Sequence, residues 1–406
     1  MTQATLEKTE AKTVTPPPKR ARSRWLALGE FCLFLIVGLL LLEPILKLGG
    51  VVDEENYTID RKVGWTPVPN RSATYRNEGY SRYTINSLGM RDVERSIAKP
   101  PNTYRIAVLG CSVTEGKQVS LDETYCRILE KQLNQAGGPI KYEVLNFAVS
   151  AYTLGQEYLR LKHFAMQFKP DLVIFTVRPN ALLYMGPDLR NGFFSARPVF
   201  GVMPDGTLVE DHHFQNHWLE SAEGKRVQST AWLSTHSHLY ALVGKSAYNL
   251  AEYKKGFGQP KRHRKSIAGF ERFKGDLEDD VQLKRTMNTA LDYLGKVAHA
   301  IVREAKSICQ KENAKFVLVY LPATAKYRYG LEEEIIESLC KELQVDYVDC
   351  NPDFDRIEKS SKKKLYIEVH PSKFGHEKMA ALLYSYLERS GLLKAAGQAE
   401  DTKNVN

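Results

Sequence analysis

Blocks of apolar residues alternate with amphipathic stretches after the first hundred residues of the chain. Short apolar runs at 105–109, 142–149 and 172–177 predict buried strands. The stretches at 123–135 and 154–168 carry apolar residues at helical spacing and predict two helices. Because each predicted strand is followed by a helix, the pattern favours a mostly parallel sheet with helices on both faces.

The same alternation returns in the C-terminal part of the chain. Residues 316–321 and 345–348 predict two further strands, and 281–313, 332–343 and 374–392 predict helices. With the earlier strands they predict a three-layer α/β/α sandwich around a mostly parallel five-stranded sheet, and we expect this domain to span 105–392.

Two segments lack this regular pattern. Residues 51–104 are rich in turn and aromatic residues and predict an irregular lead-in to the main domain. Residues 181–281 are rich in Gly, Pro, His and Phe and predict an insertion. Within it, 199–203 and 207–210 flank a Pro-Asp-Gly turn and predict a hairpin.

The N-terminal part of the chain contains one long apolar run. Residues 25–48 are long enough to span a bilayer and predict a transmembrane signal anchor. A cleaved signal peptide is the alternative, although no small-x-small cleavage site follows Leu42. Residues 1–24 predict a disordered basic tail with four basic residues next to the run, whereas only Lys47 lies just after it. The positive-inside rule therefore predicts a cytoplasmic tail and an extracytoplasmic main domain. A second polar tail is expected at 393–406.

The net charge of +9 comes from clustered basic residues. The first cluster is the group of four basic residues before the apolar run, Lys19, Arg20, Arg22 and Arg24. The second consists of Lys254, Lys255 and residues 261–265, and we interpret it as a solvated loop or as a surface for acidic headgroups or an anionic glycan. Neither cluster has an aromatic RNA-binding signature or zinc-finger spacing, so no nucleic-acid partner is predicted. The six cysteines contain no CxxC pair, and the histidines of the insertion fit no standard metal spacing, so no metal site is predicted.

Three polar residues stand at the ends of predicted strands or at the start of a helix. Ser112 follows the first strand, Asn180 follows the third, and His370 precedes the last helix. Because the carboxyl ends of parallel strands lie together, we expect the three to converge. An acyl-transfer site needs an alcohol nucleophile, a base and donors for the oxyanion. Ser112 and His370 supply the first two, and the Asn180 amide with the backbone N–H groups of Ser112 and Ala151 supplies the oxyanion hole.

Together these blocks resemble the SGNH (GDSL-like) esterase and acetyltransferase superfamily, in its bacterial membrane-anchored form. The resemblance covers about 105–180 and 315–392. It implies a flavodoxin-like fold, cleavage or transfer of esters without a cofactor, a single-pass inner-membrane location with the main domain in the periplasm, and a membrane O-acyltransferase as a partner.

The sequence departs from the family pattern at four positions. Cys111 replaces the family's aspartate before the serine, and Ala151 replaces a glycine. Arg178 stands where the family motif around the asparagine has a glycine, and Ile367 stands where the motif around the histidine has an acid. The nearest carboxylate is Glu368, two positions before the histidine, so we predict that Glu368 orients the imidazole. A serine–histidine dyad, or a site without catalysis, is the alternative.

Two functional hypotheses follow. The first is a membrane-anchored extracytoplasmic serine esterase or O-acyltransferase that acts on an ester of a cell-envelope glycan or lipid. The second is a catalytically degenerate binding or scaffold protein with the same fold. A hydrogen bond between Ser112 and His370 with Glu368 behind it would favour the first hypothesis. Glu368 turned to solvent and Arg178 filling the pocket would favour the second.

Overall fold

The computed structural model describes residues 24–49, 56–76, 78–179, 181–186, 193–244, 246, 281–324, 328 and 330–393. Both terminal tails and the basic cluster at 254–265 lie outside the described residues. The chain divides into two compact units, Met1–Gly49 and Gly50–Asn406.

The first unit contains helix α1, Arg24–Gly49. Its most apolar 18-residue window has a mean hydropathy of 2.4, and the helix is long and apolar enough to cross a membrane. An N-terminal signal sequence passes the same test of length and apolar composition, so the helix alone leaves both interpretations of this segment open.

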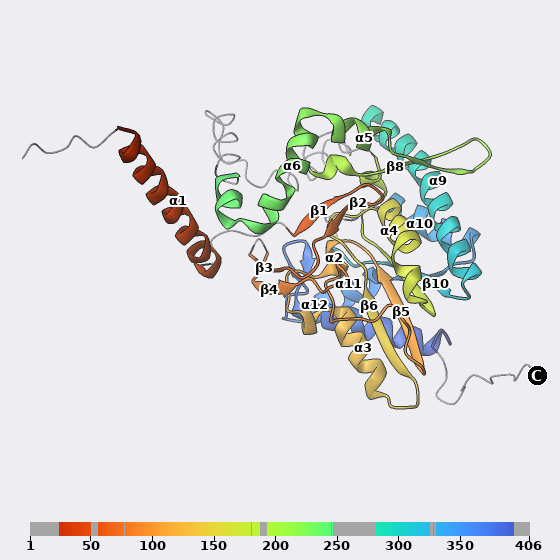
Figure 1. The fold of residues 1–406 in the computed structure, drawn as a ribbon. Coiled ribbons are helices and arrows are strands. Elements are labelled where there is room, and N and C mark those ends of the chain that lie inside the picture. The colour runs from red at the N-terminus through yellow and green to blue at the C-terminus, as the bar shows by residue number, and fades with distance from the viewer. Residues whose placement is uncertain are drawn as a thin grey trace, which may run out of the picture. The chain divides into compact units, whose positions relative to one another are not determined.

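The second unit is built around a five-stranded sheet (Figure 1). Its strands are β5 (Thr103–Leu109), β6 (Lys141–Asn146), β7 (Leu172–Val177), β10 (Lys315–Tyr320) and β11 (Asp346–Asp349). They lie in the order β11-β10-β7-β5-β6, and every pair is parallel. Numbered along the chain this is the flavodoxin-like order 2-1-3-4-5, which confirms the predicted fold class.

Helices cover both faces of the sheet. Side chains alternate between the two faces along each strand, and both faces are apolar, so each must be buried. Leu109 and Phe175 point into one core with helices α4, α9 and α10. Val108 and Ile174 point into the other core with α3, α11 and α12. The bounds of these helices are Leu154–His163 (α4), Val281–Lys311 (α9), Gly330–Glu342 (α10), Tyr125–Gln135 (α3), Asn351–Ser360 (α11) and Lys373–Arg389 (α12).

The lead-in, predicted to be irregular, forms two antiparallel hairpins. Strands β1 (Tyr57–Asp60) and β2 (Gly64–Pro67) form the first, and β3 (Ser72–Tyr75) and β4 (Ser81–Thr84) form the second. Strands of four residues are too short to show a clear alternation in the sequence. The first hairpin is anchored to the domain by Trp65, whose side chain is fully buried and whose indole N–H donates to the Ser150 carbonyl at 3.1 Å.

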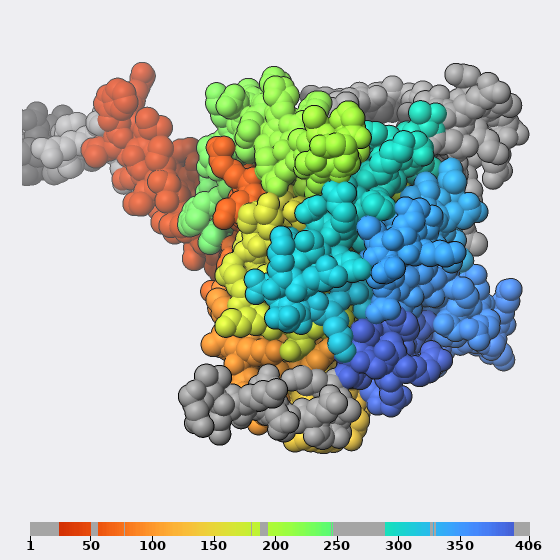
Figure 2. All heavy atoms as spheres, turned by 90° about the vertical axis from the view of Figure 1, so that its right-hand side faces the viewer, coloured from red at the N-terminus to blue at the C-terminus, as the bar shows by residue number. Residues whose placement is uncertain are grey.

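The described part of the insertion is ordered into a hairpin and helices, shown in green at one end of the domain in Figure 2. The predicted hairpin is confirmed as antiparallel β8 (Val199–Val202) and β9 (Leu208–Asp211). Helices α5 (His213–Glu220) and α6 (Ala222–His236) follow it and were not predicted. The remaining short elements are α2 (Ser112–Glu115), β12 (Tyr366–Ile367), β13 (His370–Pro371), and 3-10 turns at Leu121–Glu123, Ala165–Phe168, Leu182–Tyr184 and Phe193–Ala196.

A buried histidine joins helices α3 and α12. The Nδ1 atom of His376 accepts the backbone N–H of Tyr125 at 3.3 Å, and the two rings stack with centroids 5.9 Å apart. The side chain is fully buried. Burial, aided by the charges of Arg91 and His370, lowers the pKa of His376 to about 3.

We expect His376 to make the domain less stable as the pH falls. The unfolded chain binds the proton at an ordinary pKa of about 6.5, whereas the folded chain binds it only near 3. Below pH 6.5 the unfolded state therefore takes up more protons, and the free energy of unfolding decreases by about 1.4 kcal/mol per pH unit. Urea unfolding at pH 6.5 and pH 5 should show a loss of about 2 kcal/mol from this residue.

The control is His376→Asn, whose amide oxygen can accept the Tyr125 N–H but which does not titrate. Its unfolding free energy should vary less with pH than that of the unchanged protein. The same pH dependence in both proteins would contradict the assignment.

Candidate active site

Ser112 lies at the carboxyl edge of the sheet, where it begins α2 directly after β5. The turn between them is sharp because Gly110 packs so closely that a Cβ there would collide with the hydroxyls of Thr176 and Thr114. Strand β5 lies between β6 and β7, so Ser112 stands at the point where the strand order reverses. Open α/β sheets bind ligands at this point.

The structure brings His370 to Ser112 across 258 positions of the sequence. The Nε2 atom of His370 lies 2.8 Å from Ser112 Oγ, which is a hydrogen bond. His370 is held on β13, which pairs with β12 in a small antiparallel hairpin before α12. Its side chain is 13% exposed, so the pair is largely shielded while the serine stays half-buried.

A carboxylate that the sequence analysis missed completes the arrangement. Glu78, between β3 and β4, hydrogen bonds the Nδ1 atom of His370, and its side chain is also 13% exposed. With Nδ1–H donating to a carboxylate, Nε2 is left to accept the serine hydroxyl proton. The partners thus assign the tautomer that a general base needs.

The structure corrects the prediction for Glu368. Ile367 pairs with His370, which leaves Glu368 in the tight turn between them, with φ at +54° and its side chain exposed. Among the described residues, no hydrogen bond joins Glu368 to His370. Within the described residues, the carboxylate on His370 is that of Glu78, 292 positions away in sequence and linked to it by no motif.

Two backbone N–H groups are candidates for an oxyanion hole, one at Ser112 and one in the loop after β6. The loop after β6 runs along the end of β5, because the N–H of Val149 donates to the Gly110 carbonyl at 3.1 Å. Ala151 in this loop adopts φ +63°, a left-handed conformation that glycine favours. Within the described part of the chain, the N–H groups of Ser112 and Ala151 have no acceptor. Asn180, the third predicted donor, lies outside the described residues.

The buried carboxylate of Glu115 fixes this loop to the nucleophile turn. Glu115 ends α2 and is fully buried. It accepts the Tyr57 hydroxyl at 2.7 Å and the Ser150 N–H at 2.8 Å, and it also accepts the Ser150 hydroxyl. On the other side, the Ala151 carbonyl accepts the Arg197 guanidinium at 3.3 Å. The backbone of the predicted oxyanion loop is therefore held from both sides.

Two buried cations balance that carboxylate. The Lys117 ammonium lies 3.7 Å from Glu115 and 4.1 Å from the centre of the Tyr57 ring. Arg91 donates to the backbone carbonyl of Glu115 at 2.8 Å. Burial lowers the pKa of Lys117 and brings that of Arg91 to about 10, while the nearby Glu115 opposes both shifts. Arg91 therefore stays charged at neutral pH, and the Lys117 side chain lies against the Glu115 carboxylate.

The departures at Cys111 and Arg178 have structural explanations. Cys111 is buried in the core beneath α3 and α12. Burial raises the pKa of its thiol, so the group stays protonated and is no competitor of Ser112. The guanidinium of Arg178 lies 4.6 Å from the centre of the Tyr184 ring. Its charge also opposes the rise that burial imposes on the pKa of Glu157.

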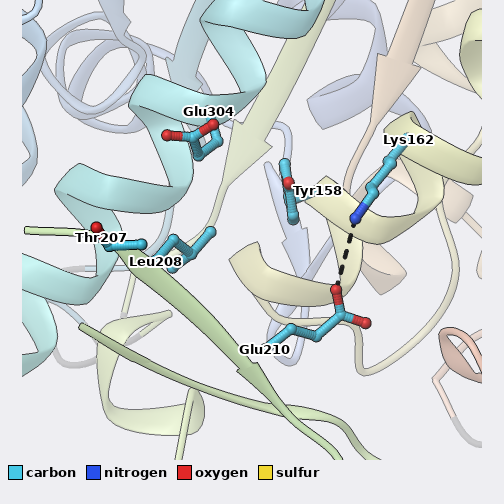
Figure 3. A pocket seen from close by; sticks show the side chains of 6 residues that line it. All are labelled: Tyr158, Lys162, Thr207, Leu208, Glu210 and Glu304. Atoms are coloured by element: carbon cyan, nitrogen blue, oxygen red, sulfur yellow. Dashed lines mark ion pairs between the residues drawn. The ribbon is translucent and has the colours of Figure 1, made fainter. Parts of the chain in front are cut away.

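A surface pocket is lined by a different set of residues (Figure 3). It encloses about 320 Å³ and is lined by Tyr158, Lys162, Thr207, Leu208, Glu210 and Glu304. The ammonium of Lys162 is 3.7 Å from the Glu210 carboxylate, and Glu304 adds a second carboxylate to the lining. It shares no lining residue with the Ser112 site.

No family model matches the chain, and no curated protein matches its sequence. Solved structures show a weak similarity. A variant of an acetyl-xylooligosaccharide esterase from Geobacillus stearothermophilus is 14% identical, with a TM-score of 0.37 over 71% of this chain and 94% of the other. An α/β hydrolase from the metagenome of Lake Arreo is 11% identical, with a TM-score of 0.37 over 74% of this chain and 99% of the other. TesA is 13% identical, with a TM-score of 0.35 over 71% of this chain and 99% of the other. Similarities of this size identify no substrate and no reaction for this chain.

We expect loss of the Glu115 carboxylate to destabilise the domain strongly. Glu115→Ala leaves the Tyr57 hydroxyl and the Ser150 N–H without their acceptor and the Lys117 ammonium without its counter-charge. Removal of one partner from a buried ion pair costs about 3–5 kcal/mol. Urea unfolding measures the loss. Glu94→Ala is the matched control, since that carboxylate is exposed and bonds only Ser87, and similar losses in both variants would contradict the role of Glu115.

Proposed function

We propose that this protein is a serine esterase or O-acyltransferase of the SGNH type, with Ser112 as nucleophile, His370 as general base and Glu78 as the acid that orients it. One observation carries the proposal. Ser112 Oγ, both ring nitrogens of His370 and the Glu78 carboxylate form an unbroken chain of hydrogen bonds at the carboxyl edge of the sheet. This is the arrangement by which a weak alcohol nucleophile is activated.

Each residue then has a defined task. His370 Nε2 takes the hydroxyl proton as Ser112 Oγ attacks the acyl carbonyl, and Glu78 stabilises the resulting imidazolium. The N–H groups of Ser112 and Ala151 stabilise the oxyanion, and Asn180 is proposed as the third donor. His370 gives its proton to the departing alcohol. Water or a glycan hydroxyl then attacks the acyl-enzyme, so the same site supports hydrolysis and transfer.

We place the reaction outside the cytoplasm, at the inner membrane. Helix α1 is long and apolar enough to serve as a single-pass anchor, and the basic residues before it favour a cytoplasmic N-terminus. The proposed substrate is therefore an acylated glycan or lipid of the cell envelope. A membrane O-acyltransferase is a partner by family analogy.

The rival hypothesis, a degenerate binding protein, is supported less well. It rested on four departures from the family pattern, and three of them leave the site intact. Cys111 faces the core, Ala151 adopts the left-handed conformation of the glycine it replaces, and the missing acid at Ile367 is offset by Glu78. Glu368 is turned to solvent, as that hypothesis expected, but Glu78 occupies the position behind His370.

Labelling of the full-length protein with a fluorophosphonate probe tests the nucleophile. We expect the unchanged protein to be labelled at Ser112 and to hydrolyse p-nitrophenyl acetate, and Ser112→Ala to lose both properties, because the probe reacts only with an activated hydroxyl. Cys111→Ala is the matched control beside it and should still be labelled. Labelling that survives Ser112→Ala would exclude this serine as the nucleophile.

A comparison of two glutamates tests the orienting acid. Glu78→Gln should lower kcat on p-nitrophenyl acetate by about 10²–10⁴-fold, because an amide neither holds the productive tautomer nor stabilises the imidazolium. Glu368→Gln, in the exposed turn, should leave kcat within about twofold of the unchanged protein. A larger loss from Glu368→Gln than from Glu78→Gln would contradict the assignment.

A further inference from the structure

The hairpin that carries Glu78 has two different faces. Its inner face is buried, through Ala73, Ser81 and Tyr83. Its outer face follows the ladder, in which Ser72 pairs with Thr84 and Thr74 with Arg82. The same register, extended by two positions, places Arg76 opposite Tyr80. The Arg76 guanidinium indeed lies 5.6 Å from the centre of the Tyr80 ring.

The outer face presents an aromatic ring between two guanidinium groups. Tyr80 is 71% exposed, and Arg76 and Arg82 are exposed as well. Within the described residues, neither arginine has an acidic partner. These three side chains, hereafter the hairpin face, therefore form a positively charged surface with an aromatic ring and no neutralising carboxylate.

The hairpin face is fixed next to the candidate active site. At the tip of the hairpin, Glu78 bonds His370. Gly79 packs so closely that a Cβ there would lie 3.3 Å from the Ile367 side chain and from the Gln118 carbonyl. Ser81 then donates to the Lys117 carbonyl. Tyr80 lies between these fixed points, about 7 Å of extended chain from Glu78.

We propose that the hairpin face binds an acidic glycan, a polysaccharide with carboxylate groups, whose ester is presented to Ser112. This inference rests on the proposed function and narrows its substrate class. The Tyr80 ring can pack against the C–H face of a pyranose, and guanidinium groups bind carboxylates with two parallel hydrogen bonds. The charge and the ring belong to the hairpin whose Glu78 bonds His370, so a sugar chain bound there would be held near the candidate active site.

The composition of the face favours a glycan over a lipid. A lipid acyl chain needs a contiguous apolar area to bind. The hairpin face offers one aromatic ring between two charges, and the positions next to it are Ser72, Thr74 and Thr84. An acidic sugar chain matches such a surface in both charge and polarity.

The experiment compares substrates on the full-length protein in detergent. Chemically O-acetylated oligogalacturonate and acetylated xylo-oligosaccharide of matched length serve as the acidic and neutral glycans, with p-nitrophenyl acetate as the minimal ester. We expect Arg76→Glu and Arg82→Glu each to lower kcat/KM on the acidic glycan by about 10-fold or more, relative to kcat/KM on p-nitrophenyl acetate. Tyr80→Ala should lower kcat/KM on both the acidic and the neutral glycan. The loss on the acidic glycan should shrink with added salt, because exposed charges are screened.

Arg61→Glu is the matched control. Arg61 is an exposed arginine in the turn of the other hairpin, and its reversal makes the same change of net charge. Arg61→Glu should leave the ratio of kcat/KM on the acidic glycan to kcat/KM on p-nitrophenyl acetate unchanged. An equal fall with Arg61→Glu, or equal losses on the acidic and neutral glycans with Arg82→Glu, would overturn the inference.

A binding measurement separates this inference from the proposed function. Ser112→Ala should bind unacetylated oligogalacturonate, and Ser112→Ala with Arg82→Glu should bind it about 10-fold more weakly, whether or not the protein is an esterase. If the unchanged protein fails to hydrolyse p-nitrophenyl acetate while this difference holds, the proposed function fails alone. Equal affinities in the two variants, or stronger binding to anionic phospholipid vesicles than to the glycan, would refute the acidic-glycan site.

Discussion

The arrangement around Ser112 depends on one buried charge, the carboxylate of Glu115. An isolated carboxylate in a protein interior is strongly unfavourable, so it is tolerated only where donors and a counter-charge surround it. Its donors are the Tyr57 hydroxyl from the first hairpin and the backbone and side chain of Ser150. The counter-charge is Lys117. The carboxylate therefore ties the turn that carries Ser112 to the loop of Ala151 and to the lead-in.

The lead-in is consequently part of the candidate active site. Its first hairpin supplies a donor to Glu115, and its second supplies the carboxylate on His370. A carboxylate therefore reaches His370 although Ile367, three positions before it, is apolar. The Ile367 side chain lies close to Gly79, next to Glu78. The carboxylate on His370 thus comes from a different hairpin than the one that carries the histidine.

Much of this could be predicted from the sequence, for identifiable reasons. Strands buried on both faces appear as continuous apolar runs, so the five strands of the sheet were predicted to within a few residues. Ser112 and His370 were predicted to meet because the carboxyl ends of parallel strands lie at the same edge of a sheet, so residues far apart in the sequence can come together there. Helix α11 was missed since it is polar and fully buries only Asn351 and Phe354.

Glu78 could not be predicted in the same way. It lies in a turn between strands of four residues, and its contact with His370 is set by how a hairpin outside the sheet packs onto it. Glu368 was predicted because it stands two positions before His370 in the sequence. In the structure it lies in the turn of that hairpin with its side chain exposed, and the carboxylate that bonds His370 comes from Glu78.

A single hairpin thus carries both the orienting acid at its tip and the arginines and tyrosine of its outer face. An isolated two-stranded hairpin is marginally stable in water, so its order depends on what its faces contact. The inner face is held through Ser81 and Tyr83, but the outer face has solvent on it until a ligand binds. A glycan on that face would add contacts to the strands that position Glu78. If the proposed glycan binds there, its recognition and the orientation of the imidazole would be linked through one small element, and binding energy far from the ester would contribute to the chemical step.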